Sequence, residues 1–293
     1  MRNILEISNL RKEYKEFTLK DISLTLPRGY IMGLIGPNGA GKSTTIKAIM
    51  NLINCDSGKI KLFGLDYENS EEEIKNKIGY VGEEQYFYED MSVKWMEQFI
   101  SQHYRQWNKD EFYALLERFN VSPTKKVQEL SKGMRVKLSL ALALAHNPEL
   151  IILDEPTSGL DPVIRSEILK ILLEIIQDEN KSVLFSTHIT EDIEKIADYV
   201  TYLIDGRIVL SAPKDELLEK WKTIHIKNGY EIREINSKLI GIEQNYFGIT
   251  GLTDRYEELK NTIKPYIEKD VIRVENTSID QILISLVKER GLC

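Results

Sequence analysis

The sequence has little cysteine, with only Cys55 and Cys293 among its 293 residues. The two form no CxxC pair, and no group of histidines and cysteines has the spacing of zinc ligands. A disulfide-stapled secreted domain and a zinc-finger module are therefore excluded, and we expect two reduced thiols in a reducing compartment. The chain is long enough to bury a hydrophobic core without such cross-links, over roughly two domains.

Long hydrophobic runs are missing too. The most apolar stretch, LSLALALA at residues 138–145, is much shorter than the ~20 residues that a membrane-spanning helix needs. The first residues, MRNILEISNLRKEYK, carry charge from position 2 and lack the apolar segment of a signal peptide. We therefore expect a cytoplasmic protein that acts at a membrane only through a partner.

Positive charge is not in excess either. The chain has 39 Lys and Arg against 46 Asp and Glu, which gives a net charge of −7. An acidic protein is a poor electrostatic match for a phosphate polymer, so we expect no nucleic-acid partner. With 42% hydrophobic and 29% charged residues, the composition is that of an ordinary globular protein.

Residues 1–212 alternate short apolar runs with longer periodic segments, which predicts an α/β fold. Buried strands separated by helices favour a mostly parallel sheet covered on both faces. The segment 91–147 has no strong strand signal, so we expect a helical subdomain there. The expected strands lie at 22–26, 30–35, 78–81, 150–153 and 183–186, and the expected helices at 92–119, 133–146, 162–179 and 190–197.

A change in composition after Ala212 and Pro213 predicts a domain boundary. Beyond it, two short β-like runs and an amphipathic helix at 278–290 predict a small α+β appendage over 213–293. This part carries no recognisable chemical motif. We expect it to be an accessory unit that supports dimerisation or regulation.

The most specific motif is GPNGAGKS at residues 36–43, which fits G-x-x-x-x-G-K-[ST] without a mismatch. Its glycines let backbone N–H groups converge on phosphate oxygens, and the helix that follows adds its dipole. Lys42 is predicted to reach the β- and γ-phosphates, and the Ser43 hydroxyl to ligate Mg²⁺. The nucleotide-binding residues expected here are Gly36, Pro37, Asn38, Gly39, Ala40, Gly41, Lys42, Ser43 and Thr44.

The second half of the site is predicted in LIILDEP at residues 150–156. An apolar strand that ends in Asp154 delivers a carboxylate to the metal beside the phosphate loop. Glu155 follows directly and is placed to polarise a water for attack on the γ-phosphate. The two motifs together predict an enzyme that binds and hydrolyses ATP.

Three more segments extend the pattern: ELSKGMR at 129–135, SGLD at 158–161 and STH at 186–188. In this order they resemble the signature, D-loop and switch of the ATP-binding subunits of ABC transporters, and the resemblance covers about residues 4–211. It implies a P-loop NTPase fold in which a mostly parallel sheet is joined by an antiparallel β subdomain and a helical subdomain. Ser131 also suits the N-cap of the helix that begins near Gly133.

The resemblance also implies residue roles and partners. Ser131 and Gly133 would bind the γ-phosphate held by the opposite subunit, and Asp161 would belong to the same nucleotide site. His188 would sense the γ-phosphate, and Tyr14 would stack on the adenine. Two such chains, identical or paralogous, would enclose ATP and drive a separate membrane permease from the cytoplasmic face of the membrane.

The sequence departs from the family pattern at a few positions. Lys132 and Met134 replace the second Gly and the Gln of the signature, and Glu83 stands where the family usually has the Q-loop Gln. We expect Glu83 to act at the metal site as a carboxylate. The alternative is that Glu83 points into solvent and its loop serves only as a hinge to the permease.

These departures, with the segment at 106–119, resemble the ATPases of ABC-2-type exporters, among them systems that export or resist peptide toxins and antimicrobial peptides. A non-transport ATPase that acts in DNA repair or on the ribosome is the alternative. Repair types insert a long coiled coil between the ATP motifs, whereas Lys42 and Asp154 are only 154 − 42 = 112 residues apart without sustained heptads. Ribosomal types carry two cassettes, and Glu155 with His188 argues against an inactive subunit.

Overall fold

The computed structural model describes residues 3–230 and 232–291. The chain forms two compact units, Met1–Ile208 and Val209–Cys293, and the division lies inside β9 (Arg207–Pro213). The boundary expected from composition, between residues 212 and 213, lies in the same strand. Within the described residues, no helix is long and apolar enough to cross a bilayer.

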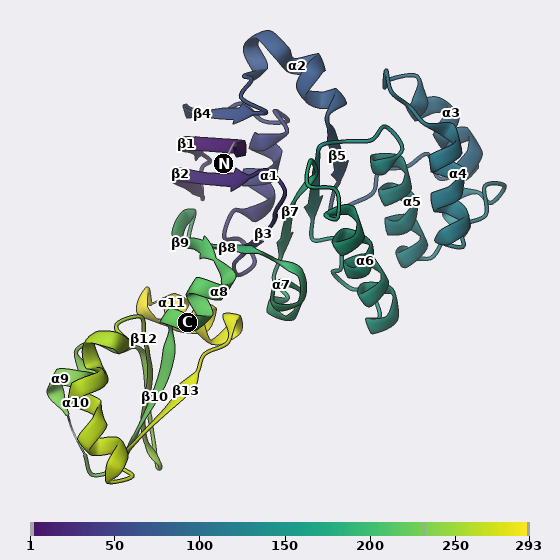
Figure 1. Ribbon diagram of the computed structural model, residues 1–293. Helices are drawn as coiled ribbons and strands as arrows, with labels where there is room; N and C mark the ends of the chain where they lie inside the picture. Colours follow the sequence, from purple (N-terminus) through teal and green to yellow (C-terminus); the bar gives the residue numbers. More distant parts are fainter. Residues whose placement is uncertain (1–2, 231, 292–293) are drawn as a thin grey trace. The chain divides into compact units, whose positions relative to one another are not determined.

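The first unit contains two sheets (Figure 1). The smaller sheet is antiparallel, in the order β2-β1-β4, and the larger one runs β5-β6-β7-β3-β8-β9. The pairs from β5 to β8 in the larger sheet are all parallel, as the sequence predicted. The strands are β1 (Asn3–Glu13), β2 (Thr18–Pro27), β3 (Ile31–Ile35), β4 (Ser57–Leu62), β5 (Ile78–Val81), β6 (Leu150–Asp154), β7 (Ser182–Thr187) and β8 (Tyr199–Ile204).

One apolar cluster joins the antiparallel sheet to the parallel sheet, with α1 (Lys42–Ile49) contributing to it. Strands β3, β6 and β7 are buried along their whole length, which explains their nearly continuous apolar sequences. The remaining helices of this unit are α2 (Tyr67–Asn76), α3 (Val93–Ser101), α4 (Lys109–Arg118), α5 (Lys132–Leu144), α6 (Pro162–Ile175) and α7 (Thr190–Ile196), with a 3₁₀ turn at Val127–Glu129.

The helical segment expected at 92–119 is two helices, α3 and α4, and the expectation of one continuous helix was wrong. Asn108 caps α4 by accepting a hydrogen bond from the Glu111 N–H at 3.0 Å. Just before it, the Trp107 indole donates to the carboxylate of Glu97 at 3.0 Å, so the connecting segment folds back on α3. Helices α3 and α4 both contact α5.

The second unit is a four-stranded antiparallel sheet in the order β11-β12-β10-β13, with helices beside it (Figure 1). Apolar side chains of β10, α9 and α10 form its core. Helix α11 contacts β11 and β12. The elements are α8 (Lys214–Lys220), β10 (Lys222–Lys227), α9 (Arg233–Asn236), β11 (Ile240–Asn245), β12 (Gly248–Thr253), α10 (Tyr256–Glu268), β13 (Ile272–Asn276) and α11 (Ile279–Glu289).

Candidate functional site

The phosphate loop connects the buried strand β3 to α1. Two of its glycines are required by geometry. A Cβ on Gly36 would lie 2.0 Å from the Leu203 carbonyl oxygen, and Gly41 has a φ of +106° with the Phe17 ring 2.6 Å from where its Cβ would be. The loop therefore closes tightly against β8 and the β1–β2 turn, and α1 begins directly after it at Lys42.

Lys42 is 6% exposed and lies inside its own loop. Its ammonium donates hydrogen bonds to the carbonyl oxygens of Gly36 at 2.9 Å and Pro37 at 3.3 Å. The same nitrogen lies 3.2 Å from Glu155 Oε1. Lys42 and Glu155, which are 155 − 42 = 113 positions apart in the sequence, therefore join the two motifs through a buried ion pair.

Asp154 ends β6 and is 2% exposed. Its Oδ1 accepts a hydrogen bond from the Ser43 hydroxyl at 3.1 Å and another from the Ser186 hydroxyl at 2.6 Å. The pairing of Asp154 with Ser43 joins the end of β6 to the first turn of α1. A carboxylate and a hydroxyl are the oxygen donors that Mg²⁺ accepts together with phosphate and water oxygens.

Glu155 has a φ of +50°, a left-handed backbone conformation that is uncommon for a residue with a side chain. Its N–H donates to Ser186, and its carboxylate is held on both oxygens. Oε1 faces Lys42, while Oε2 accepts from the backbone N–H of His188 at 3.3 Å and lies 2.8 Å from His188 Nδ1. The structure thus brings Lys42, Glu155 and His188 together.

A cavity of about 700 Å³ opens over these groups, within the usual size of ligand sites. The residues that line it include one lysine, Lys42, and three carboxylates, Glu16, Glu83 and Glu155. The lining residues are Glu16, Phe17, Asn38, Gly39, Gly41, Lys42, Ser43, Thr44, Glu83, Glu155, Ser158 and His188. A polyanion bound here needs a compensating cation, because like charges repel more strongly away from bulk water.

Glu83 lines this cavity, whereas Gln85, two residues later, lines a separate groove. The Gln85 amide donates to the carbonyl oxygen of Gly82 at 3.2 Å, inside its own loop. Burial, together with the carboxylates of Asp154 and Glu83, raises the pKa of Tyr80 to about 12. Tyr80 therefore stays a neutral phenol beside this acidic edge of the cavity at physiological pH.

The expected adenine contact, Tyr14, is 43% exposed and is not among the residues that line the cavity. Its N–H donates to the Phe17 carbonyl at 2.7 Å, so Tyr14 belongs to the same turn as Glu16 and Phe17, which do line it. Glu16 and Phe17 were missed in the sequence because they belong to no motif. Ser158 was quoted there only as part of the D-loop.

Ser131 and Gly133 of the signature and Asp161 of the D-loop lie at helix starts and do not line this cavity, whereas Ser158 of the D-loop does. Ser131 caps α5 by accepting from the Met134 N–H at 3.3 Å, as expected for an N-cap. A Cβ on Gly133 would lie 3.0 Å from Ile164, so Gly133 allows α5 to approach α6. Asp161 caps α6 by accepting from the Val163 and Ile164 N–H groups.

A buried carboxylate that the sequence did not single out connects the D-loop to the helix after the switch. Asp192 on α7 is 0% exposed, and it accepts hydrogen bonds from the Thr157 hydroxyl at 2.7 Å and the Arg165 Nε at 2.6 Å. Thr157 precedes the D-loop and Arg165 is on α6. The D-loop and the segment after His188 are therefore tied by charge-assisted hydrogen bonds.

Comparison with known proteins places these features in a family. Residues 19–158 match the sequence model of the ABC transporter family. The chain is 34% identical over 208 residues to the ABC transporter ATP-binding protein YtrB of Bacillus subtilis (strain 168), covering 71% of each chain. It is 30% identical over 249 residues to the bacitracin transport ATP-binding protein BcrA of Bacillus licheniformis, covering 84% of this chain and 80% of that protein.

Comparison with solved structures also finds ATP-binding subunits of ABC transporters. The ATP-binding subunit of an ABC transporter superposes with a TM-score of 0.66 at 28% identity, covering 74% of this chain and 92% of that one. The expected α/β fold, with its parallel sheet and antiparallel sheet, is confirmed by this similarity.

Proposed function

Because this chain belongs to the family of ABC transporter ATP-binding proteins, we propose that it powers an exporter of peptides by hydrolysing ATP beneath a separate membrane permease. Members of this family hydrolyse ATP to drive transport. The observation that carries the assignment is Glu155, held between Lys42 and His188 at the mouth of the phosphate loop. The similarity to a bacitracin transport ATP-binding protein supports a peptide as the transported substrate.

The hydrolytic step follows from these contacts. A bound triphosphate attracts the Lys42 ammonium away from the loop carbonyls and from Glu155 Oε1. Oε1 of Glu155 is then free to accept a proton from a water. The water oxygen bonds to the γ-phosphorus as the bond to the bridging oxygen breaks, releasing ADP and phosphate. His188, still bonded to Oε2, holds the carboxylate in place.

We propose that Mg²⁺ accompanies the ATP. Ser43 and Asp154 would hold it, with Glu83 as a further carboxylate, and it would supply positive charge to the phosphate oxygens. The excess of carboxylates over lysine in the cavity supports this requirement. No group of three or more His, Cys, Asp or Glu side chains in the described part of the chain is arranged to bind a metal alone, so the phosphates would complete the coordination.

A second ATPase chain, identical or paralogous, completes the proposed site. Ser131, Gly133 and Asp161 are not among the residues that line the cavity of their own chain, so any contact they make to ATP requires another molecule. The Ser131 end of α5 presents N–H groups suited to an anion. We propose that they meet the γ-phosphate held by the partner.

An apolar groove on the first unit supports the permease partner. It has a volume of about 360 Å³ and is lined by residues of the α1 end, the loop after β5, α3 and α5. On its rim Tyr86 is 87% exposed and Leu52 56% exposed, which is unusual unless another protein covers them. Binding of a permease here would place the chain at the cytoplasmic face of the membrane.

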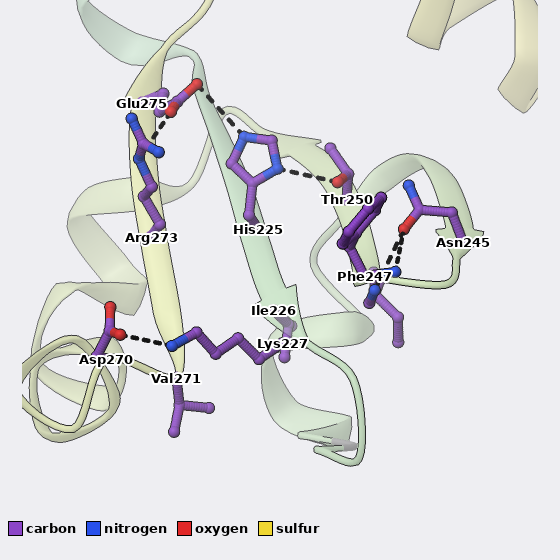
Figure 2. Close-up of a pocket in the computed structure, with 12 residues that line it drawn as sticks. His225, Ile226, Lys227, Asn245, Phe247, Thr250, Asp270, Val271, Arg273 and Glu275 are labelled. Carbon is purple, nitrogen blue, oxygen red and sulfur yellow. Dashed lines mark hydrogen bonds and ion pairs between the residues drawn. The ribbon is translucent and has the colours of Figure 1, made fainter.

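The second unit is proposed to support dimerisation, through the sheet face opposite its core. Figure 2 shows His225 between Thr250 and Glu275, with Arg273 and the Lys227–Asp270 pair on the same face. The two acids of this face, Asp270 and Glu275, are each paired with a base of the same chain, so a second copy can pack against the face without leaving either acid unpaired. Beside it, the rings of Tyr246 and Phe247 are 88% and 83% exposed at the β11–β12 turn.

The first test is Glu155→Gln. Loss of the general base should lower turnover by ~10²–10⁴-fold while ATP binding persists. The trapped ATP should then hold two chains together, which size-exclusion chromatography in Mg-ATP detects as a dimer. Lys42→Ala, which removes the phosphate contact, is the control and should show no increase in dimer when Mg-ATP is added. Elution of Glu155→Gln only as a monomer would refute the sandwich mechanism.

The second prediction concerns Glu83. Its carboxylate repels the triphosphate unless Mg²⁺ is present, so Mg²⁺ should strengthen nucleotide binding roughly three- to tenfold more in the wild type than in Glu83→Gln. Titrations of nucleotide binding and of ATPase against Mg²⁺ measure this. Glu84→Gln is the matched control, because Glu84 lines the groove instead of the cavity. Identical Mg²⁺ curves for wild type and Glu83→Gln would mean that Glu83 acts only in the loop.

The third prediction tests the groove. A Leu52→Ser/Tyr86→Ser double variant should lose most co-purification with the co-expressed permease, since it removes exposed apolar contacts. ATP binding by the isolated subunit should stay within about twofold of wild type. Leu173→Ser, on an exposed apolar position of α6, is the control. Unchanged co-purification of the double variant would place the permease elsewhere.

The fourth prediction tests the second unit without nucleotide. A Tyr246→Ser/Phe247→Ser double variant should raise the dimer dissociation constant at least tenfold in sedimentation velocity, because aromatic residues dominate interface energies. Ile267→Ser on α10, next to the opposite sheet face, should leave it unchanged. ATP binding should survive in all three proteins, since the cavity residues lie in the first unit. A wild type that stays monomeric at all concentrations without ATP contradicts the proposal.

A further inference from the structure

Ser186 is a buried hydroxyl between the two carboxylate residues of the candidate site. It is the fifth residue of β7 and is 0% exposed, after the apolar residues Val183, Leu184 and Phe185. In the parallel register, Ser186 is directly opposite Asp154 of β6. Registered residues of neighbouring strands point to the same face of a sheet, so the hydroxyl meets the Asp154 carboxylate. A buried polar group of this kind needs partners.

The direction of both hydrogen bonds is fixed by the groups involved. The Glu155 N–H donates to the Ser186 hydroxyl oxygen at 3.0 Å, since an amide N–H has no other role. The single proton of the hydroxyl is then donated to Asp154 Oδ1 at 2.6 Å. One side chain therefore bonds to the side chain of Asp154 and to the backbone of Glu155.

These two bonds act on the parts of the site that need the most accurate placement. Asp154 Oδ1 also accepts from Ser43, so Ser186 fixes the carboxylate that faces the phosphate loop. The Glu155 N–H belongs to a residue with a φ of +50°, a conformation that persists only where its surroundings enforce it. The Ser186 carbonyl oxygen, 3.2 Å from the same nitrogen, is the second contact that supports this turn.

We propose that Ser186 is a positioning residue for ATP hydrolysis, which aligns Asp154 with Ser43 and turns Glu155 toward Lys42 and His188. The inference rests on the proposed function. Without the hydroxyl, Asp154 loses the shorter of its two hydrogen bonds to serine hydroxyls, and the Glu155 N–H keeps only the Ser186 carbonyl oxygen as a partner. A displacement of about 1 Å at such a site can cost on the order of 10²-fold in rate without abolishing binding.

The test compares Ser186→Ala with Ser182→Ala. Ser182 is a matched control because it is also on β7 and 0% exposed, and its hydroxyl also accepts from a backbone N–H, that of Gly29 at 2.9 Å. It lies at the opposite end of the strand from the site. Both variants lose one buried hydroxyl, so both should lower the thermal unfolding midpoint similarly.

Ser186→Ala should lower kcat by roughly 10- to 100-fold. The KM for ATP, and nucleotide affinity measured in EDTA, should stay within about threefold of wild type. Ser182→Ala should keep kcat within about twofold. Ser186→Thr retains the hydroxyl and should recover at least several-fold of the lost kcat; where it does not fold, the two alanine variants decide.

The failure of this inference is separable from that of the proposed function. A wild-type protein without ATP hydrolysis overturns the proposed function. A wild type that hydrolyses ATP, with Ser186→Ala within about twofold of its kcat, overturns only the role of Ser186. The same holds if Ser182→Ala lowers kcat as much as Ser186→Ala, because the effect is then one of stability.

Discussion

Everything in the candidate site depends on the parallel register of four neighbouring strands, β5, β6, β7 and β3. Parallel strands end at the same edge of a sheet, and ligands of open α/β folds bind outside that edge. The segment after each strand therefore arrives at one place: the Glu83 loop, the pair Asp154 and Glu155, the switch at His188, and the phosphate loop. The fold brings together residues that span more than a hundred positions of the sequence.

Lys42 is the one lysine among the residues that line the cavity at this edge of the sheet. Its ion pair with Glu155 is therefore central to the charge balance of the site. Burying two opposite charges 3.2 Å apart carries a desolvation penalty. Their mutual attraction offsets this penalty only if the geometry is good and further hydrogen bonds are made. Lys42 gains that geometry from the loop carbonyls and Glu155 from His188. In the proposed mechanism, a phosphate that draws Lys42 away releases the Glu155 oxygen that accepts the proton from water. In this proposal, Glu155 Oε1 pairs with Lys42 before ATP binds and takes the proton during hydrolysis.

The sequence predicted the site where its chemistry is local. The phosphate loop needs its glycines, lysine and serine in one run, and an apolar strand ending in Asp154 and Glu155 can be recognised without knowing its neighbours. Ser186 could not be assigned a role in this way, because a serine near the end of an apolar strand says nothing about which residue lies opposite in the next strand. Only the register with Asp154 gives its hydroxyl a partner. The break between α3 and α4 was missed for a similar reason, since it depends on a contact between Trp107 and Glu97 across the turn.

The positions of the signature and D-loop residues support the proposal that one chain does not form the whole nucleotide site. Ser131 and Asp161 satisfy the starts of α5 and α6, and neither lines the cavity beside Lys42. The positive end of a helix dipole suits an anion, but an anion bound at these helix starts must come from outside the chain. Asp192, on the helix after His188, accepts one hydrogen bond from Thr157 before the D-loop and another from Arg165 on α6, so it ties that helix to both segments. Ser158 of the D-loop lines the cavity of its own chain, whereas Asp161 at the other end of the D-loop does not. The D-loop therefore extends from the nucleotide cavity to a segment that a second molecule can contact, which supports the proposal that two ATPase chains act together.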